Sequence, residues 1–453
     1  MKQGLRARMG VLCGAAVMMS SSMAVGQPYS YETLEVLAPD GQAQDWFGYS
    51  MAIGGGYMAV CSYNPNDLLD PGRVRVFSAG DGEFLYELTA PGISDGDAFG
   101  FRIAIDGSLL VVSAPNDQDA TGIRTAGVVY IFNLSDGAYI ARLTANDAAI
   151  TDQLGWGLGI STPAIVAGAP NDIVGSIRMG SVYVFDSRFH SQIRKFTPPG
   201  GTENARYGAA LSVNQTYLAV CALRLDSGLG ETGAVFVYSY FDGSLVNKLE
   251  ANDPQVGQGF GSTVGILGDR IYVGAPYDDD RGGTAGAVYV FDAVSGDQLA
   301  KILPPAVNPV PNNGMQFGTR LVVDEHMLLV AARLDDELVD DNGAVYVYDP
   351  VTYDYLDKIL LPDAMVDDAI GNSLAAGDRQ YGVSATNRDT QGTNSGSAFI
   401  ITQNCRPDVN DDSLVDFFDV SSLVNARIDY NGDGVFNFFD VSAFLSDFQI
   451  GCP

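Results

Sequence analysis

The chain has 453 residues, of which 55 are acidic and 25 are basic, and its formal charge is −30 at pH 7. This excess of negative charge argues against binding to nucleic acid or to anionic membranes, and it suits cation binding and solubility. The only two histidines are His190 and His326, so a histidine-based catalytic triad or a multi-histidine metal site is not expected.

The N-terminal segment has the pattern of a secretory signal peptide. Lys2, Arg6 and Arg8 precede a mostly apolar run, and small residues suit cleavage after Gly26, with cleavage after Ala24 as the alternative. A membrane anchor is the other interpretation, but the apolar run is short for a membrane span. We therefore expect residues 1–26 to be removed and the protein to be secreted or held at the cell surface.

Residues 27–402 are organised as seven copies of one unit. Each copy is expected to contain four short strands, because runs of β-branched and aromatic residues alternate with Gly, Asp and Pro turn signals. A glycine that follows an aromatic or apolar residue recurs at intervals of roughly 50 to 60 residues. These landmark glycines are Gly48, Gly100, Gly155, Gly208, Gly261, Gly318 and Gly371. The pattern predicts a mainly β fold, a seven-bladed β-propeller.

Two further motifs recur inside the unit. Ala-Pro dipeptides follow the second strand at Ala114, Ala169 and Ala275, and glycine opens the third strand at positions such as Gly127 and Gly343. Together with the landmark glycines, these motifs resemble the FG-GAP repeat of the integrin-α N-terminal type, over roughly Tyr29 to Thr402. Calcium-binding blades of that family carry an Asp-x-Asp-x-Asp-Gly loop between the first two strands. This chain has tight turns there, so the resemblance does not imply that calcium site.

The seventh copy lacks its last strand, whereas Tyr31–Ala38 precedes the first copy and matches the fourth strands of the others. We therefore predict that this N-terminal strand completes blade seven and closes the ring. Turns between first and second strands, and between third and fourth strands, are short hairpin turns. The remaining loops are long and polar, and they should gather on one face of the propeller.

Acidic residues recur in the loops between second and third strands. One interpretation is a ring of carboxylates that binds cations or polar ligands. The other, which the sequence favours, is a set of turns in which Asx side chains accept hydrogen bonds from nearby backbone amides. The residues concerned are Asn66, Asp67, Asn116, Asp117, Asn171, Asp172, Asp278, Asp279, Asp280, Asp335, Asp336, Asp340 and Asp341.

The cysteines outside the predicted signal fall into two pairs. Cys61 and Cys221 occupy equivalent second strands of non-adjacent blades, so we expect two buried, unlinked side chains. Cys405 and Cys452 bracket the C-terminal segment, and in a secreted protein this favours a disulfide between them, with two free thiols as the alternative.

Residues 403–453 contain two twelve-residue loops with oxygen side chains at positions 1, 3, 5, 9 and 12. This is the spacing of an EF-hand loop, in which a backbone carbonyl serves at position 7 and the ion is Ca²⁺. The predicted ligands are Asp408, Asn410, Asp412, Leu414, Asp416 and Asp419 in the first loop, and Asp429, Asn431, Asp433, Val435, Asn437 and Asp440 in the second. Ser413 replaces the usual glycine at position 6, so the first site is expected to be weaker.

The two loops are too close in sequence for two full helix–loop–helix hands, and each leads into one helix. The segment resembles a type I dockerin module, which implies a small α-helical domain that attaches to a cohesin-like partner and travels with polysaccharide-degrading proteins. Phe418 and Phe439 lie at loop position 11, on the polar side of each predicted helix, and suggest a partner-binding patch. Dockerins often carry Ser-Thr at positions 10 and 11, so a standard cohesin is in doubt. The alternative is that both phenylalanines pack within the protein.

Two classes of function remain open. The first is a secreted, non-enzymatic binding or scaffold protein, whose propeller binds a protein or glycan and whose C-terminal module attaches to a surface partner. The alternative is an extracellular polysaccharide-active lyase or hydrolase with carboxylates on the long-loop face. The sequence favours the first, because acidic residues are too abundant in the loops to single out a catalytic pair.

Overall fold

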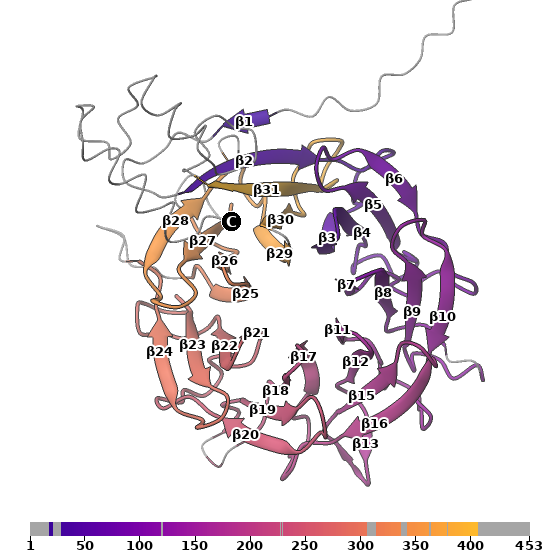
Figure 1. Ribbon diagram of the computed structural model, residues 1–453, viewed down its shortest axis with the longest axis vertical. Helices are drawn as coiled ribbons and strands as arrows, with labels where there is room; N and C mark the ends of the chain where they lie inside the picture. The colour runs from indigo at the N-terminus through magenta and orange to yellow at the C-terminus, as the bar shows by residue number, and fades with distance from the viewer. Residues whose placement is uncertain are drawn as a thin grey trace, which may run out of the picture.

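The structure is a computed structural model that describes residues 18–20, 29–118, 121–226, 228, 230–305, 314–336, 342–361, 364–377 and 379–405. Seven four-stranded antiparallel blades form a ring around a central axis (Figure 1). The first strand of each blade lies at the centre and the fourth at the rim. The predicted seven-bladed propeller is therefore confirmed, and the described part of the chain contains no helix.

The blades follow one another in chain order. Their strands, from the inner to the outer edge, are β3 (Phe47–Gly54), β4 (Tyr57–Ser62), β5 (Arg73–Ser78) and β6 (Phe84–Glu87) in blade one; β7 (Ile103–Asp106), β8 (Leu109–Ala114), β9 (Val128–Asn133) and β10 (Tyr139–Leu143) in blade two; β11 (Gly157–Ser161), β12 (Ala164–Ala169), β15 (Ser181–Asp186) and β16 (Ser191–Phe196) in blade three; and β17 (Tyr207–Val213), β18 (Tyr217–Ala222), β19 (Ala234–Ser239) and β20 (Leu245–Leu249) in blade four.

The second half of the ring has the same order. Its strands are β21 (Thr263–Leu267), β22 (Arg270–Ala275), β23 (Ala287–Asp292) and β24 (Gln298–Ile302) in blade five; β25 (Phe317–Val323), β26 (Leu328–Ala332), β27 (Ala344–Tyr348) and β28 (Tyr355–Ile359) in blade six; and β29 (Ile370–Gly377), β30 (Gln380–Ala385), β31 (Ser397–Cys405) and β2 (Tyr29–Val36) in blade seven.

The ring closes through β2, as the sequence predicted. All eight residues of β2 pair with β31, from Tyr29 opposite Cys405 to Val36 opposite Ala398. The strand β31 continues three residues beyond its predicted end at Thr402, because β2 begins early enough to pair with that extension. A short strand β1 (Met18–Ser20), inside the predicted signal segment, pairs with the outer edge of β2.

The hydrophobic core lies between the blades rather than within one central layer. Seven apolar clusters are present among the described residues, and each joins two neighbouring blades. The second strands are buried along most or all of their length, completely in β12 and β18, because both faces of a blade are covered by its neighbours. Cys61 and Cys221 are fully buried and free in these layers, which confirms that prediction.

The recurring glycines hold neighbouring blades together. Phe317, just before a landmark glycine, donates its backbone N–H to Ala285 of the preceding blade at 2.9 Å. A Cβ on Gly286 would lie only 2.0 Å from the Phe317 carbonyl oxygen, and φ is +89° at Gly286, so only glycine fits. The same close approach joins Gly72 to Phe99, Gly127 to Leu154, Gly180 to Tyr207, Gly233 to Phe260, Gly343 to Ile370 and Gly396 to Phe47.

Candidate binding face

The long loops gather on one face of the propeller, because successive strands of a blade are antiparallel. This long-loop face holds the connections between second and third strands and those between blades, including the hairpin of β13 (Ile173–Val174) and β14 (Ile177–Arg178). In the described part of the chain, the opposite, short-loop face carries short turns. His190 and His326 lie in two of these turns, on blades three and six.

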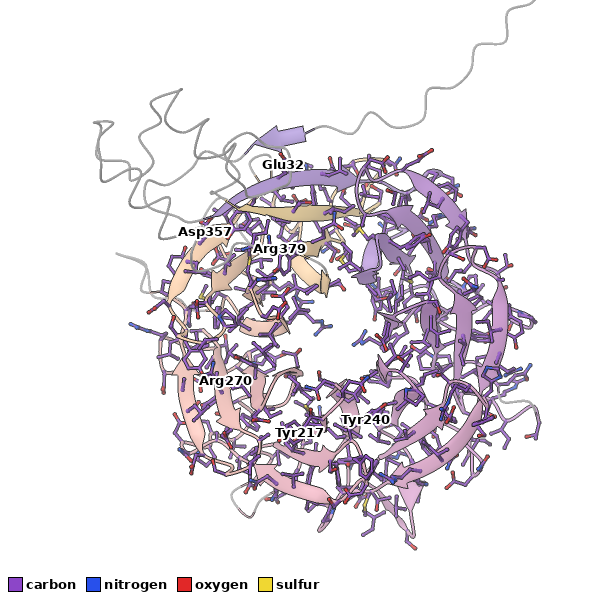
Figure 2. The ribbon with its side chains drawn as sticks, viewed as in Figure 1. Glu32, Tyr217, Tyr240, Arg270, Asp357 and Arg379 are labelled. Atoms are coloured by element: carbon purple, nitrogen blue, oxygen red, sulfur yellow. The ribbon has the colours of Figure 1, made fainter. Side chains whose placement is uncertain are left out.

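Hydrogen bonds between blades stabilise the short-loop face. Tyr217 donates to Asp269 of the next blade at 3.0 Å, and Tyr240 donates to the Ser161 carbonyl of the preceding blade at 2.7 Å. Arg270 donates to the Val351 carbonyl at 3.3 Å. Figure 2 labels Tyr217, Tyr240 and Arg270, which belong to blades four and five. These contacts therefore join neighbouring blades on the short-loop face, and the long loops lie on the other side.

Many acidic side chains of the long-loop face are used inside their own turns. Asp70 accepts the backbone N–H groups of Asn64 and Gly72 at 2.7 and 2.8 Å. Asp278 accepts the N–H of Asp280 at 3.1 Å. The favoured interpretation as Asx-type turns is thus confirmed for Asp278 and for Asp67, which accepts the N–H of Leu69 at 3.0 Å. Among the described residues no group of three or more His, Cys, Asp or Glu side chains could hold a metal ion.

A second use of the acidic loops was not predicted. In four blades a buried aspartate after the second strand accepts a hydrogen bond from a tyrosine on the third strand and forms an ion pair with a cation on the fourth. The hydroxyl-to-carboxylate distances are 2.5, 3.1, 2.8 and 2.7 Å in Asp117–Tyr130–Arg142, Asp172–Tyr183–Lys195, Asp278–Tyr289–Lys301 and Asp335–Tyr346–Lys358. We call these four sets the blade triads.

Sheet register explains why the blade triads form. Each tyrosine lies directly opposite its cation on the neighbouring strand, and the cation lies over the aromatic ring. The signal in the sequence is a basic residue at a constant separation after the motif tyrosine. This separation predicts a contact only once the pairing register of the two strands is known, and the repeats alone do not determine that register.

Blade five has the most densely charged triad. Lys301 Nζ lies 3.0 Å from Asp278, 2.7 Å from Asp253 and 2.5 Å from Asp280. Burial acts to lower the pKa of Lys301, but hydrogen bonds to Asp253 and Asp280 outweigh it, so the pKa is raised overall. The single positive charge of this amine therefore reduces the repulsion among three carboxylates, one of which is the buried Asp278.

The Lys301→Met substitution is expected to lower the free energy of unfolding by about 2 kcal/mol, because it leaves Asp278 buried without its cation. Blade four supplies a matched control. Lys248 lies opposite Phe236 in the same register, but the buried residue after β18 is Leu225 instead of aspartate. Lys248→Met should therefore change stability by no more than about 0.5 kcal/mol in urea unfolding. Equal losses in the two variants would contradict the proposed role of the triad.

Asp152, in the loop that leads into blade three, gives a pH-dependent prediction. Burial raises the pKa of Asp152 from 3.8 to about 6. Because the folded state holds this proton more tightly than the unfolded state, the contribution is stabilising below about pH 4 and is lost as the pH rises through 6. Asp152→Asn should therefore increase the free energy of unfolding by about 2 kcal/mol at pH 7 and change it little at pH 4.

Asp147, in the same loop, is a control of opposite sign for that measurement. Burial acts to raise the pKa of Asp147, but the Lys195 amine at 2.7 Å outweighs it and lowers the pKa overall. Its carboxylate contributes stability above pH 4, and that contribution is lost on acidification. Asp147→Asn should thus destabilise the protein at pH 7, and urea unfolding curves of both variants at pH 4 and pH 7 check the two signs.

Aromatic side chains cluster at the end of the central channel nearer the long-loop face. Phe101 lies 4.8 Å from Trp156 and 5.8 Å from Tyr49, measured between ring centroids. These residues follow landmark glycines of blades one to three, and Tyr63 packs against Tyr49 at 5.1 Å. Trp156 and Tyr49 are partly exposed. A partly exposed aromatic surface beside polar loops can stack against the flat face of a sugar or a peptide side chain.

Comparison with known protein families identifies the repeats. Four segments match the FG-GAP repeat family, residues 31–77, 85–132, 139–185 and 244–291. Over these four segments the propeller is similar to FG-GAP repeats. Each matched segment begins with the outer strand of one blade and ends in the third strand of the next, and blades outside these segments have the same strand order. No curated protein matches the chain.

The predicted C-terminal site residues lie outside the described residues. These are the twelve calcium ligands from Asp408 to Asp440, the phenylalanines Phe418 and Phe439, and Cys452. Cys405 ends β31, and only its backbone is described. In the described part of the chain, no helix has the length and apolar character required to cross a membrane.

Proposed function

We propose that this protein is a secreted, non-enzymatic binding or scaffold protein whose propeller holds a protein or glycan ligand on its long-loop face. One observation carries the proposal: a closed ring of FG-GAP-like repeats presents its long loops on a single face, opposite a face of short turns. An FG-GAP propeller suggests a binding or scaffold role. The four buried aspartates of the blade triads support this, because tyrosines and cations engage them structurally rather than leaving them for catalysis.

The ligand side of the proposal can be tested on a glycan array with the intact protein. Trp156→Ala removes an aromatic side chain from the long-loop face, and we expect it to reduce retention of bound glycans. Phe241→Ala is the matched control, because Phe241 is 94% exposed in a turn of the short-loop face. Loss of binding in both variants, or in neither, would argue against a site on the long-loop face. Release of reducing or unsaturated ends from a polysaccharide panel would instead support the alternative lyase or hydrolase.

We further propose that residues 403–453 form a calcium-dependent, dockerin-like module that attaches the propeller to a cohesin-like or other surface partner. The support is the pair of loops with oxygen side chains at EF-hand positions. Titration calorimetry of the intact protein should show uptake of two Ca²⁺ ions, the weaker at the loop that contains Ser413. Asp408→Ala and Asp429→Ala should each remove one ion, whereas Asp67→Ala in blade one should remove none. Absence of calcium uptake by the unmodified protein would refute the module.

Phe418 and Phe439 supply the proposed contact of that module with its partner. Replacing both by serine should abolish capture by a cohesin panel or by the native secretome, and it should leave the calcium-loaded melting temperature unchanged. A lower melting temperature with unaltered capture would show that both side chains pack within the protein. Because loop positions 10 and 11 are Phe-Phe in both copies, the panel should include cohesins that recognise apolar residues.

A further inference from the structure

A cavity of about 250 Å³ lies on the propeller axis, where residues from all seven blades form its wall. The wall residues lie one to four positions after the landmark glycines, on the inner strands or just before them. Although the chain contains 55 acidic residues, none of them lines the cavity. Two of the lining residues are arginines, Arg102 and Arg320. The interior of the channel is therefore positively charged in a strongly negative protein.

The two arginines have no counterion in the described structure. Arg102 of blade two donates to the Phe101 carbonyl at 2.9 Å, and Arg320 of blade six donates to the Thr319 carbonyl at 3.0 Å. These are carbonyls of the preceding residues, and no carboxylate of the described residues lies within ion-pair distance of either guanidinium. By contrast, Arg75 and Arg388, which are buried elsewhere in the propeller, each lie beside two carboxylates.

The environment of Arg320 disfavours its positive charge. Burial, together with repulsion by Arg102 and by Arg333, lowers the pKa of Arg320 to about 10. Partly desolvated cations that repel one another destabilise a fold unless an anion neutralises them. The channel therefore has the positive charge that an anion requires.

Neutral hydrogen-bond donors complete the wall. The hydroxyl groups of Tyr49, Thr263 and Ser373 belong to residues that line the same cavity. No hydrogen bond joins the Tyr49 hydroxyl to another described residue. Guanidinium groups bind carboxylate, sulfate and phosphate groups through paired N–H donors, and hydroxyl groups can donate further hydrogen bonds to the same oxygens. A volume of about 250 Å³ admits such a group or a small molecule that carries it, but not a polymer chain.

We propose that the axial cavity binds a small oxyanion, either free or as the terminal carboxylate, sulfate or phosphate group of a larger ligand, and that Arg102 and Arg320 are its principal contacts. The site accounts for the absence of acidic residues from the channel wall, and it gives the propeller selectivity for negative charge despite its negative exterior. The proposal stands independently of any partner on the outer loops.

Calorimetry and thermal unfolding of the intact protein in calcium-free buffer test the site. Sulfate, phosphate and a uronic-acid oligosaccharide are titrated against chloride at constant ionic strength. We expect saturable binding of one anion per chain and a rise in melting temperature for the unmodified protein. Arg102→Gln and Arg320→Gln should each lose this rise. Arg124→Gln, which alters an exposed arginine outside the channel, should retain it.

The baseline stability of the variants separates a binding role from a structural one. Sulfate stabilises most proteins by exclusion from their surface, and that general increment should be equal in all four proteins. Without the anion, Arg102→Gln and Arg320→Gln should melt at or above the temperature of the unmodified protein, because each removes an uncompensated charge. Binding of the oligosaccharide alone would identify a ligand-borne group as the source. Equal responses to every anion in all four proteins would overturn the proposal. It would also be overturned if the unmodified protein showed no response to any anion and the two channel variants melted at a lower temperature than it does.

Discussion

Removal of residues 27–38 is expected to lower the free energy of unfolding by on the order of 5 kcal/mol or more. The deletion removes all of β2, including its eight-residue pairing with β31, and the buried side chains of Val36 and Ala38. It also exposes the outer edge of β31 and opens the ring at blade seven, where two strands distant in sequence pair. Thermal and urea unfolding of the truncated protein measure the loss.

A protein that begins at residue 27 is the control for this deletion. It lacks the predicted signal segment and β1 but keeps β2, and its unfolding free energy should match that of the full chain within about 0.5 kcal/mol. If the protein without residues 27–38 melted at the temperature of this control, closure by β2 would contribute nothing to stability. A ring whose seventh blade has only three strands would then be as stable as the closed ring.

Glu35→Lys is expected to lower the free energy of unfolding by about 3 kcal/mol, because it breaks a buried ion pair and places two cations together. Glu35 lies on β2, and its carboxylate is 3.2 Å from Arg388, whose side chain is only 5% exposed. Arg388 also lies 3.4 Å from Asp368 and over the ring of Phe399. Glu32→Lys is the matched control, since Glu32 lies on the same strand (Figure 2) but is exposed. It should change stability by less than about 0.5 kcal/mol.

The closing blade has the blade triad with its charges exchanged. Arg388 stands after the second strand, where blades two, three, five and six have aspartate, and Glu35 stands opposite Phe399, where those blades have a cation opposite tyrosine. The combination Glu35→Lys, Arg388→Asp and Phe399→Tyr recreates the set Asp172–Tyr183–Lys195, with Asp368 in the place of Asp152. This triple variant should recover most of the stability that Glu35→Lys loses. If it proved less stable than Glu35→Lys alone, the exchanged pair would not be equivalent to a triad.

The exchange has a consequence for folding. A fourth strand that carries Glu35 is matched to Arg388 of blade seven and mismatched to the aspartates of four other blades. Blade one is also inverted, with Arg75 in the tyrosine position, paired to Glu87 on the fourth strand at 3.1 Å. The N-terminal strand therefore bears a charge that fits the seventh blade and opposes pairing with the blades that carry a complete triad.

Much of the architecture follows from the sequence alone, because its determinants are local and repeated. The landmark glycines all have φ between 84° and 96°, a backbone conformation that glycine tolerates and other residues rarely adopt. Short stretches of sequence likewise predicted the hairpin turns, the apolar second strands and the N-terminal strand that precedes the first copy. Seven repetitions of the same signals determined the blade number, and the unpaired strands at the two ends determined how the ring closes.

The triads and the channel, by contrast, were decided only in the tertiary structure. Asp278, Tyr289 and Lys301 come from a loop and two strands, and they meet because the pairing register places the lysine opposite the tyrosine. Arg102 and Arg320 are far apart in sequence and reach the same cavity only because the ring brings blades two and six around one axis. The role of an individual acidic or basic residue cannot be predicted from the sequence, because its charge acts mainly on groups within a few ångströms. Strand register and closure of the ring determine which groups those are.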